Sequence, residues 1–208
     1  MKKVAVLVSG GGSNLQALID AVKAGEIPAQ ISLVISNKPG VYALERAAQA
    51  GIPGVVIPTK DRSREEYSRQ ILATLQSEGI DLVCLAGFTR ILAPFVPQAY
   101  PNRMLNIHPS LLPAFGGEGM YGLRVHQAVL ESGAKFTGAT VHLVTAETDR
   151  GPIVCQDVVR VGDDDTPETL ARRVLEVEHR IYPQALKILA EGRLKIKGFR
   201  TWCQEYYK

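Results

Sequence analysis

Two polar side chains share one strand face in the stretch 105–115, "LNIHPSLLPAF". If a strand ends at His108, side chains alternate between its faces, so Asn106 and His108 point the same way. An asparagine amide can donate a hydrogen bond to an oxygen that gains negative charge, and an imidazole titrates near neutral pH. Buried polar groups need partners, so a core strand would not carry both without a reason. The pair predicts oxyanion stabilisation or proton transfer; the alternative is a histidine satisfied within the core.

A glycine-rich segment, "SGGGSN" at residues 9–14, lies between an apolar run and a helical pattern. Glycines leave the backbone free to point N–H groups at an anion, and a helix N-terminus adds partial positive charge. Leu15 takes the place of the third glycine of a dinucleotide motif, and no lysine follows as in nucleoside triphosphatases. The segment favours a mononucleotide phosphate over NAD or ATP. The alternative is a tight turn in which Asn14 caps the helix.

Asp149, in "TAETDRGPIV", precedes a Gly-Pro pair. A carboxylate there is often only a turn former. If the loop folds back on His108, the negative charge would instead favour the imidazolium form and raise its pKa. Glu147 competes for that role, so the residues alone leave the choice open.

The segment 85–92, "LAGFTRIL", leaves an apolar strand with Phe88, Ile91 and Leu92 close together. These side chains could line an apolar slot for a flat ring, or could simply pack the loop. Three arginines, Arg64, Arg90 and Arg124, are candidate partners for an anion, with solvated side chains as the alternative.

The other histidines give weaker signals. His142 lies in an extended segment, where a core or rim position is favoured over catalysis. His126 opens a helix and is expected to be structural or exposed. Glu178 and His179 lie within a helical pattern, where Glu178 could bind a ligand amine or belong to a solvated face.

The elements that position these residues alternate regularly along the chain. Apolar runs at 4–9, 31–36, 54–57, 81–87 and 103–108 predict strands, with helical patterns between them. Gly25, Gly51 and Gly79 mark helix ends, and Ser63 with Glu66 forms a capping box.

The second half predicts a helix at 125–131, a close pair of extended segments at 139–144 and 153–161, and a helix from Pro167. Pro183 either kinks this helix or starts another, with the end near Gly192. The pattern predicts a three-layer α/β fold: a mostly parallel twisted sheet, helices on both faces, a Rossmann-like N-terminal half, and a mixed or antiparallel edge toward the C-terminal half.

Composition narrows the possible partners. The chain has 208 residues, 46% hydrophobic and 22% charged, and a net charge of +3, which suits a small anionic ligand better than nucleic acid. Its three cysteines are widely spaced without a CxxC pair, so neither a zinc site nor a disulfide framework is expected. No apolar run approaches a membrane span. We therefore expect a cytoplasmic protein with no metal, no nucleic-acid partner and no membrane contact.

Six segments in order, "SGGGSNL", "SREEYSRQI", "LAGFTRIL", "NIHPSLLPAF", "TVHLVTAETDRGPIV" and "EHRIYPQAL", resemble the phosphoribosylglycinamide formyltransferases, the folate-dependent enzymes of purine biosynthesis. The resemblance runs nearly end to end. "HPSLLP" alone is also similar to methionyl-tRNA formyltransferase and to formyltetrahydrofolate deformylase.

The resemblance implies a role for each matching residue. The catalytic set would be Asn106, His108 and Asp149; the substrate set Gly12, Ser13, Asn14 and Glu178; and the folate-contacting set Arg64, Phe88, Thr89, Arg90, Ile91, Leu92 and Asn106. One departure is that Arg124 and His126 stand where family members often carry a His-x-His pair. The glycine-rich loop that precedes them is also longer than in some members.

The implied activity is transfer of the formyl group of N10-formyltetrahydrofolate to the amine of 5-phosphoribosylglycinamide, in de novo purine (IMP) biosynthesis. The amine would attack directly, with Asn106 and a protonated His108 stabilising a tetrahedral intermediate and Asp149 keeping His108 protonated. A single domain would span residues 1–208, with a phosphate-binding half at 1–100 and a catalytic and folate-binding half at 101–208. Its partners would be small molecules, and it would be a monomer or homodimer. The alternatives are formyltetrahydrofolate hydrolysis, methionyl-tRNA formylation and a non-catalytic nucleotide-binding module.

Overall fold

Seven strands form one sheet in the computed structural model, which describes residues 1–203. The strands are β1 (Lys2–Val8), β2 (Ala29–Ser36), β3 (Gly54–Val56), β4 (Leu82–Ala86), β5 (Met104–His108), β6 (Phe136–Leu143) and β7 (Ile153–Arg160). Their order is β3-β2-β1-β4-β5-β6-β7, parallel from β3 through β5 and antiparallel at β5–β6 and β6–β7. The predicted mostly parallel sheet with an antiparallel C-terminal edge is confirmed.

Strand β1 shows why the apolar runs lack alternation. Val4, Val6 and Val8 enter the core on one face of the sheet, whereas Ala5 and Leu7 enter the core on the other. Both faces of a central parallel strand are covered by helices, so both sets of side chains are apolar.

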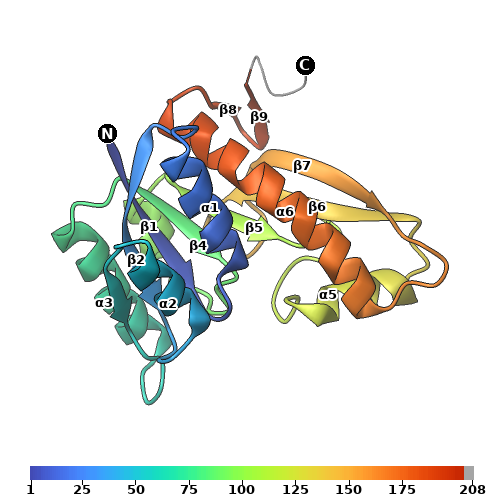
Figure 1. The fold of residues 1–208 in the computed structure, drawn as a ribbon, viewed down its shortest axis with the longest axis horizontal. Helices are drawn as coiled ribbons and strands as arrows, with labels where there is room; N and C mark the ends of the chain where they lie inside the picture. Colours follow the sequence, from blue (N-terminus) through green and yellow to red (C-terminus); the bar gives the residue numbers. More distant parts are fainter. Residues whose placement is uncertain (204–208) are drawn as a thin grey trace.

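Six helices in the described part of the chain cover the sheet. They are α1 (Ser13–Lys23), α2 (Tyr42–Gln49), α3 (Arg64–Ser77), α4 (Phe95–Ala99), α5 (Leu123–Glu131) and α6 (Pro167–Ala190). Buried residues of α1, α2, α5 and α6 share one core, and those of α3 and α4 share the other. Figure 1 shows the long helix α6 crossing the strands of the C-terminal half beside α1.

The predicted helix signals are confirmed. Ser63 and Glu66 form a reciprocal capping box, and the glycines after α1, α2 and α3 all have positive φ. Pro183 lies inside α6, and one helix runs through it to Ala190, so the possibility that this proline starts another helix is wrong. Tyr182 and Leu186 beside it are fully buried, and this packing offsets the backbone hydrogen bond that the proline removes.

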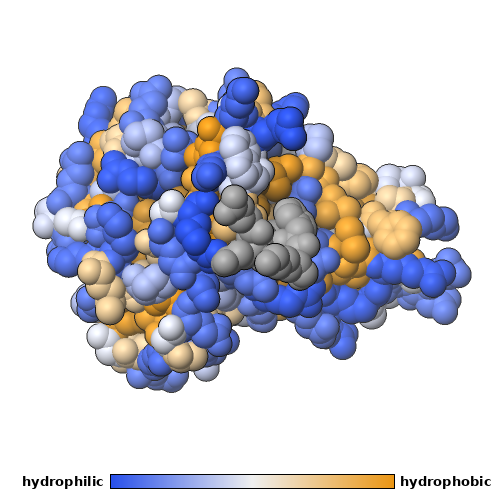
Figure 2. Space-filling view, turned by 90° about the horizontal axis from the view of Figure 1, so that it is seen from above, coloured by the Kyte–Doolittle hydropathy of each residue, from blue (hydrophilic) through white to orange (hydrophobic). Residues whose placement is uncertain are grey.

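Three short elements were not predicted: α4, and the hairpin of β8 (Lys195–Lys197) and β9 (Arg200–Trp202). Each has five residues or fewer, which is too short for a periodic signal. Figure 2 shows hydrophilic side chains over most of one face, with a strip of hydrophobic residues on the right of that view. Within residues 1–203, no helix is long and apolar enough to span a membrane.

Candidate active site

A cavity of about 1140 Å³ opens at the carboxyl ends of β4 and β5. Its wall contains every residue predicted for catalysis or folate contact, together with Asn14 and Glu178. Gly12 and Ser13 do not line it, although they directly precede Asn14. Residues from both halves of the chain therefore face one space, the position at which open α/β sheets bind ligands.

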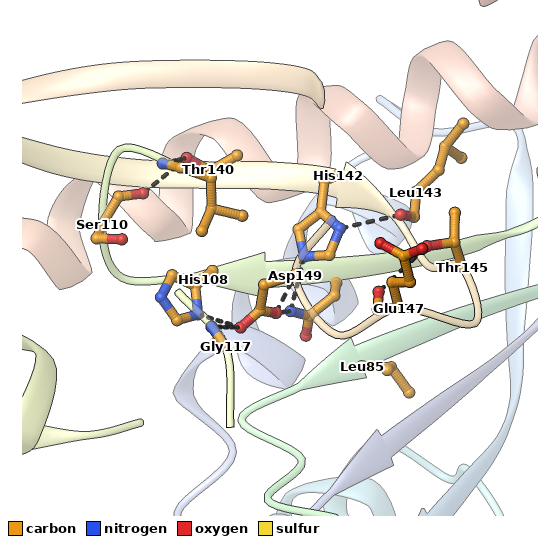
Figure 3. A network of polar contacts seen from close by, with 12 residues as sticks. Leu85, His108, Ser110, Gly117, Thr140, His142, Leu143, Thr145, Glu147 and Asp149 are labelled. Atoms are coloured by element: carbon orange, nitrogen blue, oxygen red, sulfur yellow. Dashed lines mark hydrogen bonds and ion pairs between the residues drawn. The ribbon is translucent and has the colours of Figure 1, made fainter. Parts of the chain in front are cut away.

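Asp149 is the centre of a polar cluster in this cavity. Its Oδ2 lies 3.6 Å from His108 Nδ1 and accepts a hydrogen bond from the Gly117 N–H at 2.9 Å. Its Oδ1 lies 3.5 Å from His142 Nε2 and 3.4 Å from Asn106 Nδ2. Figure 3 shows His108, His142 and Gly117 turned toward this carboxylate. The loop that carries Asp149 folds back on His108. The carboxylate therefore lies where its negative charge can favour the imidazolium form of His108.

Strand register brings the cluster together. Asn106 pairs with His142, and His108 with Thr140, across the antiparallel β5–β6 ladder. The Thr140 hydroxyl donates to the Ser110 carbonyl and accepts from the Leu112 N–H, so the chain after His108 is held against β6 (Figure 3). The loop beyond returns to Asp149 through Gly117.

Burial determines the charge of His108 in the substrate-free protein. Burial lowers the pKa of His108 below its usual value, and the Asp149 carboxylate and the Phe115 carbonyl only partly offset this. Because a carbonyl can only accept, the Nε2 atom, 2.8 Å from the Phe115 oxygen, carries the hydrogen of the neutral ring. The expectation that Asp149 keeps His108 protonated near neutrality is therefore wrong for this state: Asp149 acts in the expected direction, but burial is the larger effect.

Asp149 itself stays ionised. Burial raises its pKa, but the neighbouring His142 and His108 imidazoles and the Gly117 N–H together bring the pKa below the usual range. A negative charge is thus fixed between two imidazoles and an amide.

The glycine loop is shaped by α2. The Gly10 carbonyl accepts from the Ala43 N–H at 3.1 Å, and the Gly11 carbonyl accepts from Arg46 Nε at 2.9 Å. In a trans peptide the N–H points opposite to the carbonyl, so the N–H groups of Gly11 and Gly12 point away from α2. Such consecutive N–H groups beside the α1 N-terminus suit an anion.

Gly12 is the N-cap of α1, with φ 71°, and an added Cβ would lie 2.6 Å from Ala43 Cβ. The alternative in which Asn14 caps the helix is therefore wrong. The Asn14 side chain instead donates to Glu178 Oε2 at 2.6 Å, and both residues are buried.

Glu178 does not belong to a solvated helix face. Its burial raises its pKa to about 7, opposed by the hydrogen bond from Asn14. One turn later on α6, the Tyr182 hydroxyl donates to the Leu85 carbonyl at 2.9 Å and lies 3.3 Å from the Leu105 carbonyl. The "EHRIYP" segment therefore connects α6 to α1, β4 and β5.

The folate-contacting segment predicted at 88–92 forms an apolar wall of the cavity. Phe88 stacks on Tyr67 with ring centroids 6.4 Å apart, and Leu92 is buried. The Thr89 N–H donates to Ser9 Oγ at 2.9 Å, and the Arg64 guanidinium donates to the Leu92 carbonyl. Ile91 and Arg90 are exposed at the rim.

Helix α5 contributes Leu123, Arg124 and His126 to the cavity wall. Arg124 lies over the Tyr121 ring, 5.4 Å from its centroid, and His126 is buried. Burial lowers the pKa of His126, and the nearby His108, when it is protonated, lowers it further. Within residues 1–203, no group of three or more acidic, histidine or cysteine side chains is placed to hold a metal ion.

His142 is the residue of this site that sequence reasoning missed. It is 2% exposed and lies in the cavity wall, in contact with two of the three predicted catalytic residues. Only the register of β6 against β5 reveals this, and no local sequence signal gives that register.

The chain is similar in sequence and in fold to known proteins. The sequence profile of the family described as "Formyl transferase" matches residues 2–186. A relative from Haemophilus influenzae, named "Phosphoribosylglycinamide formyltransferase", is 46% identical over 198 residues, covering 95% of this chain and 91% of the relative. The human "Trifunctional purine biosynthetic protein adenosine-3" is 47% identical over 207 residues, and the chain spans 20% of its length.

Two solved structures are close in fold. The glycinamide ribonucleotide transformylase 1 of Symbiobacterium toebii has a TM-score of 0.92 at 46% identity, covering 98% of this chain and 94% of that one. A formyltetrahydrofolate deformylase from Pseudomonas syringae has a TM-score of 0.89 at 29% identity, covering 97% of this chain and 65% of that one. The chain therefore belongs to the formyl transferase family.

Proposed function

We propose that this protein transfers the formyl group of N10-formyltetrahydrofolate to the amine of 5-phosphoribosylglycinamide, a step of purine biosynthesis. The supporting observation is that one cavity joins three chemically different regions: the Asp149 cluster, the apolar wall at 88–92, and the Asn14–Glu178 pair beside the glycine loop. A two-substrate transfer needs this arrangement, with the two substrates meeting at the polar cluster.

The wall residues suit a folate. Phe88, Ile91 and Leu92 offer apolar surface for a flat ring, and the arginines Arg64 and Arg90 suit its anionic tail. The co-substrate supplies the formyl group. The residues of the cluster offer hydrogen-bond donors and a carboxylate for this chemistry.

Asn106 and His108 act on the formyl oxygen. As the amine attacks, this oxygen gains negative charge, which Asn106 Nδ2 and a protonated His108 stabilise as hydrogen-bond donors. Because His108 is neutral at rest, it must take up a proton as the substrates bind and negative charge develops beside it. Asp149 favours that protonated form and can pass protons between the amine and the leaving folate nitrogen.

The ribonucleotide binds on the other side of the cluster. Its phosphate would meet the N–H groups of Gly12, Ser13 and the glycines before them, and Glu178 would contact the glycinamide portion. Asn14 holds the Glu178 carboxyl in place at 2.6 Å.

One assay separates this function from its alternatives. The protein is mixed with formyl-folate, with and without the ribonucleotide, and folate release and formylated product are followed. Folate release only with the ribonucleotide supports transfer. Release without it supports hydrolysis, an alternative that the 29% identity to the deformylase supports less than the higher identities support transfer. No release in either mixture supports a binding module, and formylation of charged methionyl-tRNA supports the remaining alternative.

The other expectations stay predictions. They are the cytoplasmic location, the monomeric or dimeric state, the absence of metal, nucleic-acid and membrane partners, and the division into halves at residue 100.

A further inference from the structure

His142 has one tautomer available while it is neutral. Its Nδ1 lies 2.9 Å from the Leu143 carbonyl oxygen (Figure 3), and a carbonyl only accepts. Nδ1 therefore carries the hydrogen, and Nε2 presents a lone pair to the cluster. With 2% of its surface exposed, the ring has little room to turn.

That lone pair faces the Asn106 amide. Asn106 Nδ2 lies 3.1 Å from His142 Nε2 and 3.4 Å from Asp149 Oδ1. The opposite amide orientation would place the Asn106 carbonyl oxygen against both a lone pair and a carboxylate, which is repulsive. Together His142 and Asp149 thus hold the amide nitrogen inward, and within residues 1–203 the Asn106 Oδ1 atom accepts no hydrogen bond.

The two hydrogens of this amide are held unequally. The contact between Asn106 Nδ2 and His142 has an ordinary hydrogen-bond length, whereas the contact between Asn106 Nδ2 and Asp149 is long. The second hydrogen can therefore turn to another acceptor at small cost.

We propose that His142 is a positioning residue: it accepts one hydrogen of the Asn106 amide, so that the other is presented to the oxygen that gains charge. The inference rests on the proposed formyl transfer. It assigns His142 no contact with the reacting atoms, because its effect passes through Asn106.

A double-mutant cycle tests this directly. His142→Leu lowers kcat about 10- to 100-fold, because the amide loses its buried acceptor, while KM for both substrates stays within about threefold. In an Asn106→Ala background, the same substitution lowers kcat by less than about threefold, since the residue through which it acts is gone. His142→Gln, which can offer an amide oxygen, keeps more activity than His142→Leu.

Val141→Ala is the matched control. Val141 is the neighbouring residue on β6, fully buried and on the opposite strand face. It should lower the unfolding temperature as a core truncation does, yet leave kcat near wild type in both backgrounds. A further loss of more than tenfold on adding His142→Leu to Asn106→Ala would overturn the inference.

A second measurement needs no activity. In ¹⁵N-labelled substrate-free protein, the neutral form of His142 should show a protonated Nδ1 and an unprotonated Nε2, with the Asn106 amide resonances displaced by His142→Leu but not by Val141→Ala. A protonated Nε2, or an Asn106 amide unaffected by His142→Leu, would also overturn the inference. If wild-type protein transfers no formyl group, the proposed function fails, and these spectra still decide whether His142 orients Asn106.

Discussion

The Asp149 cluster and the glycine loop at residues 9–14 both prepare the protein for negative charge, by different means. The cluster uses side chains from β5, β6 and the loop before β7, and its charge depends on protonation. The loop uses backbone N–H groups whose direction is set by Ala43 and Arg46, and these do not titrate. The cluster should therefore control turnover and its pH dependence, whereas the loop should control affinity.

The largest effect should come from removing a donor of the cluster. Asn106→Ala and His108→Ala should each lower kcat roughly 100- to 1000-fold, the usual cost of losing one oxyanion donor. Steady-state kinetics measures this loss, and thermal unfolding checks that the variants fold. Near-wild-type turnover in either variant would remove the cluster from the chemistry.

Asp149→Asn tests whether the Asp149 cluster sets the pH dependence of kcat. Asp149 raises the His108 pKa against the larger effect of burial, so its loss lowers that pKa further. The protonated fraction at a given pH falls, and the decline of kcat with rising pH should begin at lower pH. At neutral pH we expect a loss of roughly 100-fold.

The pH profile of kcat should be unchanged in the control Asp157→Asn. Asp157 pairs with Arg180 and does not line the cavity. An unchanged profile in Asp149→Asn would instead separate this carboxylate from His108.

Gly12→Ala tests whether the glycine loop binds the ribonucleotide through its backbone N–H groups. Its φ of 71° is unfavourable for alanine, and the new Cβ would overlap Ala43. We expect about 2–4 kcal/mol less stability and a KM for the ribonucleotide raised about tenfold, with kcat little changed. Gly10→Ala, whose methyl meets nothing within 4 Å, is the stability control. A kcat loss larger than the change in KM would contradict the division of roles.

Glu178→Gln should give the smallest effect, seen in stability. The pKa of Glu178 rises from 4.5 to about 7 on folding, so its contribution is full below pH 4.5 and is lost as pH rises through 7. The variant lacks this loss. The difference in unfolding free energy, variant minus wild type, should therefore increase by about 1–3 kcal/mol from pH 5 to pH 8. The exposed Glu176→Gln should show no such trend in a denaturant titration. If the stability of the wild-type protein is independent of pH in this range, Glu178 does not titrate there.

Most of the fold could be predicted because its signals are local. Doubly apolar strands such as β1 indicate a parallel sheet, and glycines with positive φ end α1, α2 and α3 where expected. The errors came where packing overrides local preference, as at Pro183, or where an element such as α4 is too short to show a period.

The residues of the site also fall into two groups: those predictable from a local sequence signal and those whose contacts depend on packing. Asn106 and His108 are visible as a strand-face anomaly, because alternation is a local property. Asp149 and Glu178 received their roles only from the family resemblance, since their contacts depend on loop return and on α6 packing. His142 required the β5–β6 register, and the neutral state of resting His108 required knowing how deeply it is buried.

The site can be completed only late in synthesis, because two of its contacts need helix α6. Asn14 belongs to the first helix made, but its partner Glu178 and the Tyr182 hydroxyl on the Leu85 carbonyl lie in the last one. During translation, the nascent sheet must wait with one face partly uncovered until α6 leaves the ribosome. An arrest of synthesis before residue 167 would therefore yield a chain that holds Asn106, His108 and Asp149 but exposes the apolar surface that chaperones bind.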